Sequence, residues 1–248
     1  MGAMITLEMR KNLQDRGLLF WTLILPIIFT VLFIAVFTSG SNESVRDQVI
    51  TSIIPGYIVM FIFFIMITMV ETFIKDLNSG MTARLASTPL SPYLYLLGKW
   101  IPYIYIVLTQ IIVLFAFGKL VYNIPLGQPL LLLALSLSLT FTVTGLGLAL
   151  ALLVKTFNMG LAITQVFALG GAILSGLWMP IDMMPNFIQG ISRFLPQYWA
   201  HQVLQEAMTG TLQYADFIIA WFILFGFGLL GFVIAFIQYP NFLKRARS

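Results

Sequence analysis

Few residues in this chain are of types that carry out chemistry. Its 248 residues include one histidine (His201), nine carboxylates and no cysteine. Metal sites and acid–base catalysis both need several titratable side chains close together. These carboxylates are instead dispersed among the polar segments of the sequence. We therefore expect neither an enzyme nor a metal site, and we interpret His201 as an ordinary residue at a membrane interface.

The sequence also lacks a convincing nucleotide-binding motif. The sequence contains no G-x-x-x-x-G-K-[ST] phosphate loop, so the chain is not expected to bind ATP itself. Residues 226–231 match G-x-G-x-x-G, but no predicted strand precedes them and no acidic residue follows for a ribose. They lie within an apolar stretch, where glycines allow helices to pack closely. No cofactor is expected in this chain.

Six long stretches contain no Asp, Glu, Lys, Arg or His: residues 17–42, 48–70, 100–118, 120–154, 156–181 and 217–243. About 20 apolar residues suffice to cross a bilayer as a helix. Hydrophobic residues make up 60% of the chain and charged residues only 9%. The sequence therefore predicts an all-α polytopic membrane protein with a single transmembrane domain over residues 1–248. Its predicted transmembrane helices are about 18–38, 50–71, 99–118, 129–154, 160–179 and 217–238.

The positive charges predict an orientation for these helices. If both termini are cytoplasmic, three basic residues lie outside, namely Arg46, Lys119 and Arg193, and the other ten lie inside. Basic segments stay preferentially in the cytoplasm. We therefore expect a multi-pass protein of the cell (plasma) membrane, surrounded by lipid, with cytoplasmic N- and C-termini. Because the positive charge is dispersed, nucleic acid is not an expected partner.

The lack of ionisable residues in the six stretches also bears on the energy source. Pumps driven by protons or sodium usually place such residues within the membrane, where they carry the coupling ion. Backbone carbonyls and hydroxyls can hold sodium instead, so an ion-coupled carrier is an alternative. If transport is active and ATP-driven, the energy is expected to come from another subunit.

Two polar segments have helical spacing of apolar residues. An apolar residue recurs every four positions from Ile5 to Leu13, which predicts an N-terminal amphipathic helix on the cytoplasmic surface. The same spacing continues from Phe73 to Leu85 ahead of Pro89. It predicts a short rigid helix that presents polar groups to the cytoplasm. For both segments, a passive surface helix and a docking surface are open interpretations.

The segment after the fifth span contains uncharged pieces too short to cross the membrane. Asp182 and Pro185 are typical of helix starts, Pro196 interrupts the run, and Gly210 can close it. We expect an external helical hairpin that re-enters the outer leaflet or forms an interfacial cap. The residues that we assign to this hairpin are Pro180, Pro185, Phe194, Pro196 and Trp199.

Small residues recur every four positions on the fifth span, at Ala168, Ala172 and Gly176. Such a stripe lets another helix backbone approach closely. It predicts either internal helix packing or a face between two subunits.

Two groups of motifs resemble ATP-binding-cassette (ABC) type-2 transporter permeases. Residues 80–92 read Gly-Met-Thr-Ala-Arg-Leu-Ala-Ser-Thr-Pro-Leu-Ser-Pro, and Leu-Gly-Lys follows at residues 97–99. The family typically has Gly-Thr, Arg-Leu, Thr-Pro-Leu and Leu-Gly-Lys in this order. A second match covers residues 174–180, with Met-Pro and Leu-Pro following. The chain departs from the pattern at Met81, where Thr is common.

The resemblance implies partners and a coupling element. Two permease subunits, alike or different, would assemble with two ABC ATPase subunits that bind ATP and Mg²⁺. The helix after the second span would dock in a groove of the ATPase, and the first and fifth spans would lie near the permease interface. The implied coupling residues are Lys75, Asp76, Asn78, Ser79, Gly80, Arg84, Leu85, Thr88, Pro89, Ser91 and Pro92.

From this resemblance we expect the membrane permease of an ATP-driven exporter. Because the spans offer no charged site for a small ion, the expected cargo is amphiphilic or lipophilic: a drug, an antibiotic or a peptide. A lipid-linked glycan is the alternative cargo. A non-transporting membrane scaffold or sensor is an alternative of a different class.

Overall fold

The computed structural model describes residues 2–40, 42–87, 91–178 and 181–247. Within these ranges the chain is helical and contains no strand. Six helical segments are long and apolar enough to cross a membrane: Arg16–Phe37, Val49–Asn78, Tyr93–Tyr122, Pro129–Leu153, Phe157–Leu174 and Tyr214–Arg245. We number them spans 1 to 6. The predicted all-α polytopic membrane protein with six transmembrane helices is therefore confirmed.

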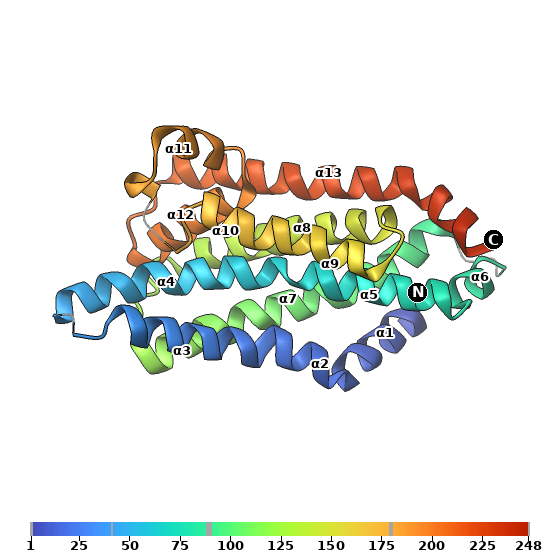
Figure 1. The fold of residues 1–248 in the computed structure, drawn as a ribbon, viewed down its shortest axis with the longest axis horizontal. Helices are drawn as coiled ribbons and strands as arrows, with labels where there is room; N and C mark the ends of the chain where they lie inside the picture. The colour runs from blue at the N-terminus through green and yellow to red at the C-terminus, as the bar shows by residue number, and fades with distance from the viewer. Residues whose placement is uncertain (1, 41, 88–90, 179–180, 248) are drawn as a thin grey trace.

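The spans lie side by side as a bundle, with both termini at one end and the helices α11 and α12 at the other (Figure 1). We call these the terminus end and the hairpin end. In chain order the elements are α1 (Gly2–Gln14), α2 (Arg16–Leu19), η1 (Phe20–Ile24), α3 (Leu25–Phe37), α4 (Glu43–Phe63), α5 (Ile65–Asn78), α6 (Met81–Ala86), α7 (Pro92–Tyr122), α8 (Pro129–Leu153), α9 (Phe157–Gln165), η2 (Val166–Gly170), α10 (Gly171–Leu174), η3 (Ile181–Met183), α11 (Asn186–Ser192), α12 (Pro196–Thr209) and α13 (Tyr214–Arg247).

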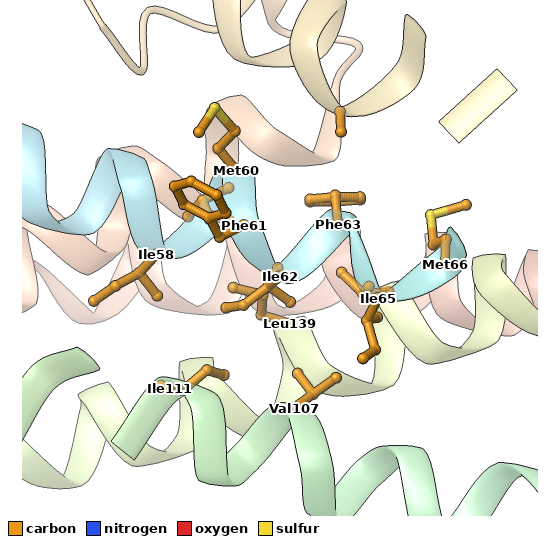
Figure 2. Packing of buried hydrophobic residues seen from close by; sticks show 14 of the residues in the cluster. Ile58, Met60, Phe61, Ile62, Phe63, Ile65, Met66, Val107, Ile111 and Leu139 are labelled. Atoms are coloured by element: carbon orange, nitrogen blue, oxygen red, sulfur yellow. The ribbon is translucent and has the colours of Figure 1, made fainter. Parts of the chain in front are cut away.

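Span 2, formed by α4 and α5, is the centre of the bundle. In its most apolar window 83% of the residues are buried, against 22–28% in spans 1, 3, 5 and 6. In Figure 2, Val107 of α7 and Leu139 of α8 lie below span 2, on the side of Ile62 and Ile65. The outer spans leave many large apolar side chains exposed, as expected for helices that face lipid rather than water.

Spans 4 and 6 pack most closely, through glycines. A Cβ atom on Gly231 of α13 would collide with the backbone of Gly145 on α8, and one on Gly228 would collide with Phe141. The Thr142 hydroxyl donates a hydrogen bond across this contact to the Leu224 carbonyl at 2.7 Å. Two of the three glycines in the run 226–231 therefore serve helix packing, as the sequence indicated.

The prediction of a single helix from Phe73 to Leu85 is wrong, because this segment forms two helices. α5 ends at Asn78 and α6 begins at Met81. Gly80 between them has a φ of +69°, in the left-handed region that glycine adopts easily and that ends α-helices. The apolar spacing runs through this break, so spacing alone does not reveal it.

The N-terminal segment does form a helix, α1, but its polar side faces the protein. Glu8 and Asn12 are buried, whereas Leu13 of the apolar stripe is 61% exposed. Met4 packs on span 3, where a Cβ on Gly98 would collide with the Met4 side chain. Ile5 and Met9 of the stripe are half-buried, so only its Leu13 end is free, while Glu8 and Asn12 contact the bundle.

Proline and glycine bound the helices of the hairpin as predicted. Pro185 is the N-cap of α11, Pro196 is at the start of α12, and Gly210 ends α12 with a φ of +81°.

At the other end of the bundle, α7 starts earlier than predicted. The Ser91 hydroxyl accepts a hydrogen bond from the Leu94 N–H at 3.3 Å and caps the helix there, so Lys99 lies inside span 3 rather than at its first residue.

The glycine contact between spans 4 and 6 can be tested by adding single methyl groups. We expect Gly231→Ala to destabilise the protein by about 1–3 kcal/mol, because the added Cβ overpacks a backbone contact. Gly226→Ala on the same helix is the matched control, since nothing lies within 4 Å of a Cβ there. Thermal unfolding in detergent would compare them. Equal unfolding midpoints for the two variants would contradict the packing argument.

Candidate functional site

A groove of about 770 Å³ lies between spans 1, 2 and 5. This volume falls in the usual range of small-molecule sites, about 300–1,000 Å³. The lining residues are Asp15, Gly17, Leu18, Trp21, Leu25, Phe29, Phe33, Tyr57, Met60, Phe61, Phe64, Ile67, Thr68, Glu71, Lys75, Phe157, Leu161, Gln165, Leu169 and Trp178. Most of them are aromatic or aliphatic.

Aromatic contacts join the walls of the groove that spans 1 and 2 provide. The rings of Phe29 and Phe61 meet edge to face with centroids 5.7 Å apart, and those of Phe33 and Tyr57 lie 5.2 Å apart. Aromatic side chains offer large apolar surfaces with few rotatable bonds. A groove with such walls has the surface to hold a flat or elongated apolar group.

Charged residues gather where the groove reaches the terminus end of the bundle. Lys75 and Glu71, one turn apart on α5, form an ion pair of 2.6 Å. The Asp15 carboxylate accepts a hydrogen bond from the Leu18 N–H at 3.0 Å and caps α2. The groove is therefore apolar along its length and charged at one end, which suits an amphiphilic molecule.

A buried cluster of charges lies beside this end of the groove. Lys99 has no exposed surface, Glu8 is 2% exposed and Asp76 is 4% exposed. The Lys99 ammonium contacts Glu8 at 2.9 Å and also pairs with Asp76. Lys11 joins from the partly exposed side, 3.4 Å from Asp76 and 3.5 Å from Glu8. We call these four residues the charge cluster.

The charge cluster balances its own charge and ties three segments together. Glu8 and Lys11 belong to α1, Asp76 to α5 and Lys99 to α7. Two carboxylates face two ammonium groups, so neither sign is in excess. A buried charge is tolerated only when it is paired and hydrogen-bonded. This requirement explains why α1 turns its polar side toward the bundle.

The predicted coupling residues divide into buried, exposed and undescribed groups. Asp76 is inside the charge cluster, so its carboxylate faces the protein rather than solvent. Lys75, Asn78, Ser79 and Arg84 are exposed. The remaining predicted residues are Gly80 at the break before α6, Ser91 at the cap of α7, Thr88 and Pro89, which lie outside the described residues, and Leu85 and Pro92, whose side chains are not described. Their role toward a partner stays a prediction.

The three predicted small residues do not form one helical stripe, because span 5 ends at Leu174 and Gly176 follows it with a φ of +73°. Ala168 and Ala172 have no exposed surface, and Gly176 is buried. Nearby, a Cβ on Gly56 of α4 would collide with the Leu177 carbonyl. Ala168 and Ala172 are thus buried within the chain, and a subunit face at this position stays a prediction.

Of the named hairpin residues, Phe194 is exposed between α11 and α12. Trp199 is half-buried, and its indole N–H donates to the Arg193 carbonyl at 2.8 Å. Pro180 lies outside the described residues. Entry of the hairpin into the bilayer stays a prediction.

His201 holds the hairpin to span 2. It is buried on α12, and its Nε2 lies 3.3 Å from the Ser52 carbonyl, to which the neutral ring can donate a hydrogen bond. Burial lowers the pKa of His201 from 6.5 to about 4, because removal from water disfavours the charged ring. The histidine is therefore neutral at physiological pH and has a structural role on the hairpin.

Sequence reasoning gave no role to three members of the charge cluster, Glu8, Lys11 and Lys99. Lys99 stood out only as the last residue of a family motif, and Glu8 as one charge on an amphipathic helix. One signal was available: a lysine directly precedes the third uncharged stretch, where a helix continuing inward would bury it. Its partners are 23 and 91 residues away in the sequence, and no local pattern identifies them.

The charge cluster predicts a large effect from removing its central lysine. We expect Lys99→Met to destabilise the protein by about 3–5 kcal/mol, because two buried carboxylates would lose their counter-charge. Adding Glu8→Gln and Asp76→Asn should recover most of this loss. Lys75→Met breaks the Glu71 pair, whose side chains are 38% and 67% exposed, and should cost only about 0–1 kcal/mol. Unfolding midpoints in detergent would test this, and equal losses for the two lysine variants would contradict it.

The lowered pKa of His201 predicts a pH dependence of stability. Below pH 6.5 the unfolded state binds a proton that the folded state does not bind until about pH 4. Stability is therefore retained above pH 6.5 and should fall by about 2 kcal/mol between pH 7.5 and pH 5. Unfolding midpoints at these two pH values would measure the loss. His201→Gln should reduce the difference between them, and an unchanged difference would assign it to other groups.

Comparison with known proteins identifies the family of this chain. A family profile described as "ABC-2 family transporter protein" matches residues 42–237. The chain is 28% identical over 197 residues to the putative transport permease YvfS of Bacillus subtilis (strain 168), covering 77% of this chain and 78% of that protein. It is 27% identical over 212 residues to the linearmycin resistance permease protein LnrN of the same organism, covering 85% of this chain and 53% of that protein. Because the family match extends over most of its length, this chain belongs to the ABC-2 family of transporter membrane proteins.

Proposed function

We propose that this protein is the permease subunit of an ATP-driven exporter and that the groove between spans 1, 2 and 5 is its part of the transport path. ABC-2 permeases work with an ATPase subunit, and no phosphate loop is present in this sequence. In this proposal two permeases and two ATPases form the transporter. The terminus end of the bundle faces the cytoplasm, and the hairpin end faces outward.

The observation that carries the proposal is the position of α5. On one side of this helix, Ile67, Thr68 and Glu71 line the groove. Asp76 joins the charge cluster one turn further on. After Gly80 the chain continues directly into α6, which would dock in the ATPase. A movement of α6 would therefore reach the groove wall through one continuous helix and the charge cluster.

The composition of the groove supports an amphiphilic cargo. Its long apolar walls can hold an extended hydrophobic body, and its charged end can hold a polar group. A relative, LnrN, is named for resistance to the antibiotic linearmycin. We therefore propose that a drug, antibiotic or peptide of amphiphilic character is moved outward.

The test begins with purification from the native membrane in mild detergent. We expect a phosphate-loop ATPase to accompany the chain in near-equal amount by mass spectrometry. Arg84→Glu should reduce this amount at least severalfold, because the side chain is exposed on α6 and charge reversal disfavours a complementary surface. In liposomes containing the complex, ATP should drive movement of an amphiphilic dye, and Arg84→Glu should slow it.

Lys119→Glu is the matched control for this test. It makes the same charge reversal at an exposed position near the hairpin end, away from α6, and should leave ATPase association unchanged. If no ATPase accompanies the chain in several detergents, the exporter proposal fails. Dye movement driven by an ion gradient without ATP would instead identify a carrier.

A further inference from the structure

Every span that lines the groove is interrupted, whereas the other three spans are continuous. Span 1 contains the π-helical turn η1, span 2 has a turn at Phe64 between α4 and α5, and span 5 contains the π-helical turn η2. Spans 3, 4 and 6 lie in single α-helices of 31, 25 and 34 residues. A π turn holds one extra residue with longer-range hydrogen bonds, and such turns are frequent at functional sites.

The π turn of span 5 lies between the groove and the hairpin. Gln165 and Leu169 face the groove at this level. The Phe167 carbonyl, inside the same turn, accepts a hydrogen bond from the Gln197 side-chain amide at 3.0 Å. Gln197 is the second residue of α12, so the hairpin directly contacts the irregular part of the groove wall.

The Gln197 side chain packs closely against Gly171 of span 5. Gln197 has no exposed surface. A Cβ on Gly171, the residue directly after the π turn, would collide with the Gln197 amide. Because Gly171 has no side chain, the Gln197 amide can occupy this space. A larger residue at position 171 would displace the amide from the Phe167 carbonyl.

Only one of the two polar atoms of the Gln197 amide has a hydrogen-bond partner. Its amide nitrogen is bonded, but its Oε1 has no hydrogen-bond partner among the described residues. A buried unpaired polar atom costs about 1–3 kcal/mol, comparable to the gain from one hydrogen bond. The bonded arrangement is thus only weakly favoured over one in which the amide leaves the carbonyl and is hydrated.

We propose that Gln197 is a positioning residue that holds the π turn of span 5 and thereby sets the shape of the groove. Losing the extra residue of the turn would rotate the rest of the span by about 100°, one residue of an α-helix. Gln165 and Leu169 would then change position relative to span 1. A shift of the hairpin would break the Gln197 bond and start this change, which links the outer end of the bundle to the groove. The inference rests on the proposed function only in identifying the groove as the path.

The native sequence lacks cysteine, so spin labels can be placed on the full chain without background. Phe29→Cys and Leu169→Cys put one label on each side of the groove, at partly exposed positions. The chain would be placed in lipid nanodiscs and the label-to-label distance measured. In Gln197→Met, which keeps the side-chain length but cannot donate a hydrogen bond, we expect the distance to shift or broaden by several ångström.

Two further variants complete the test. Gln202→Met makes the same replacement at an exposed position on α12 and should keep the parent distance. Gly171→Ala should displace the Gln197 amide from the other side and reproduce the Gln197→Met distances, so it can replace that variant if Gln197→Met does not fold. Parent-like distances in folded Gln197→Met or Gly171→Ala would overturn the inference. The distance measurement needs no ATPase, so failure of the proposed transport function would be recognised separately.

Discussion

Helices in a bilayer gain little from burying apolar side chains against one another, because lipid tails are equally apolar. Their association depends on close backbone approach and on polar contacts between helices. Both occur between spans 4 and 6, where Gly145 meets Gly231 and Thr142 bonds to the Leu224 carbonyl. Span 3 is joined to its neighbours in the same way, through Trp100 to Thr144 at 2.8 Å and Tyr103 to Thr72 at 2.7 Å.

This constraint divides the bundle into two parts. Spans 3, 4 and 6 are uninterrupted helices joined to each other or to the central span by direct hydrogen bonds and glycine contacts. Spans 1, 2 and 5 are interrupted and surround the groove. Spans 3, 4 and 6 contain no π turn, whereas the π turns of spans 1 and 5 are irregular places at which a helix can change its hydrogen bonding. The arrangement suits a transporter in which one part is a frame and the other changes shape.

The buried charges join the two parts at one end of the bundle. Lys99 and its partners are placed at the terminus end, where α1, α5 and α7 meet. Glu8, Asp76 and Lys99 are buried, and each would be expensive to bury without its partner. The cluster ties α1, α5 and α7 together and gives the N-terminal helix a place in the bundle.

Sequence alone was enough for features that depend on local physics. Length and apolarity identified six spans, proline and glycine identified the hairpin boundaries, and the motif at residues 80–92 pointed to the family. It failed at Gly80, because the apolar spacing continues through a residue whose backbone is left-handed. Only the tertiary structure showed that Lys99 meets Glu8, 91 residues away, and that Gln197 reaches the Phe167 carbonyl. The sequence pattern reports which faces are apolar, whereas a buried polar contact depends on which helices become neighbours and how closely they pack.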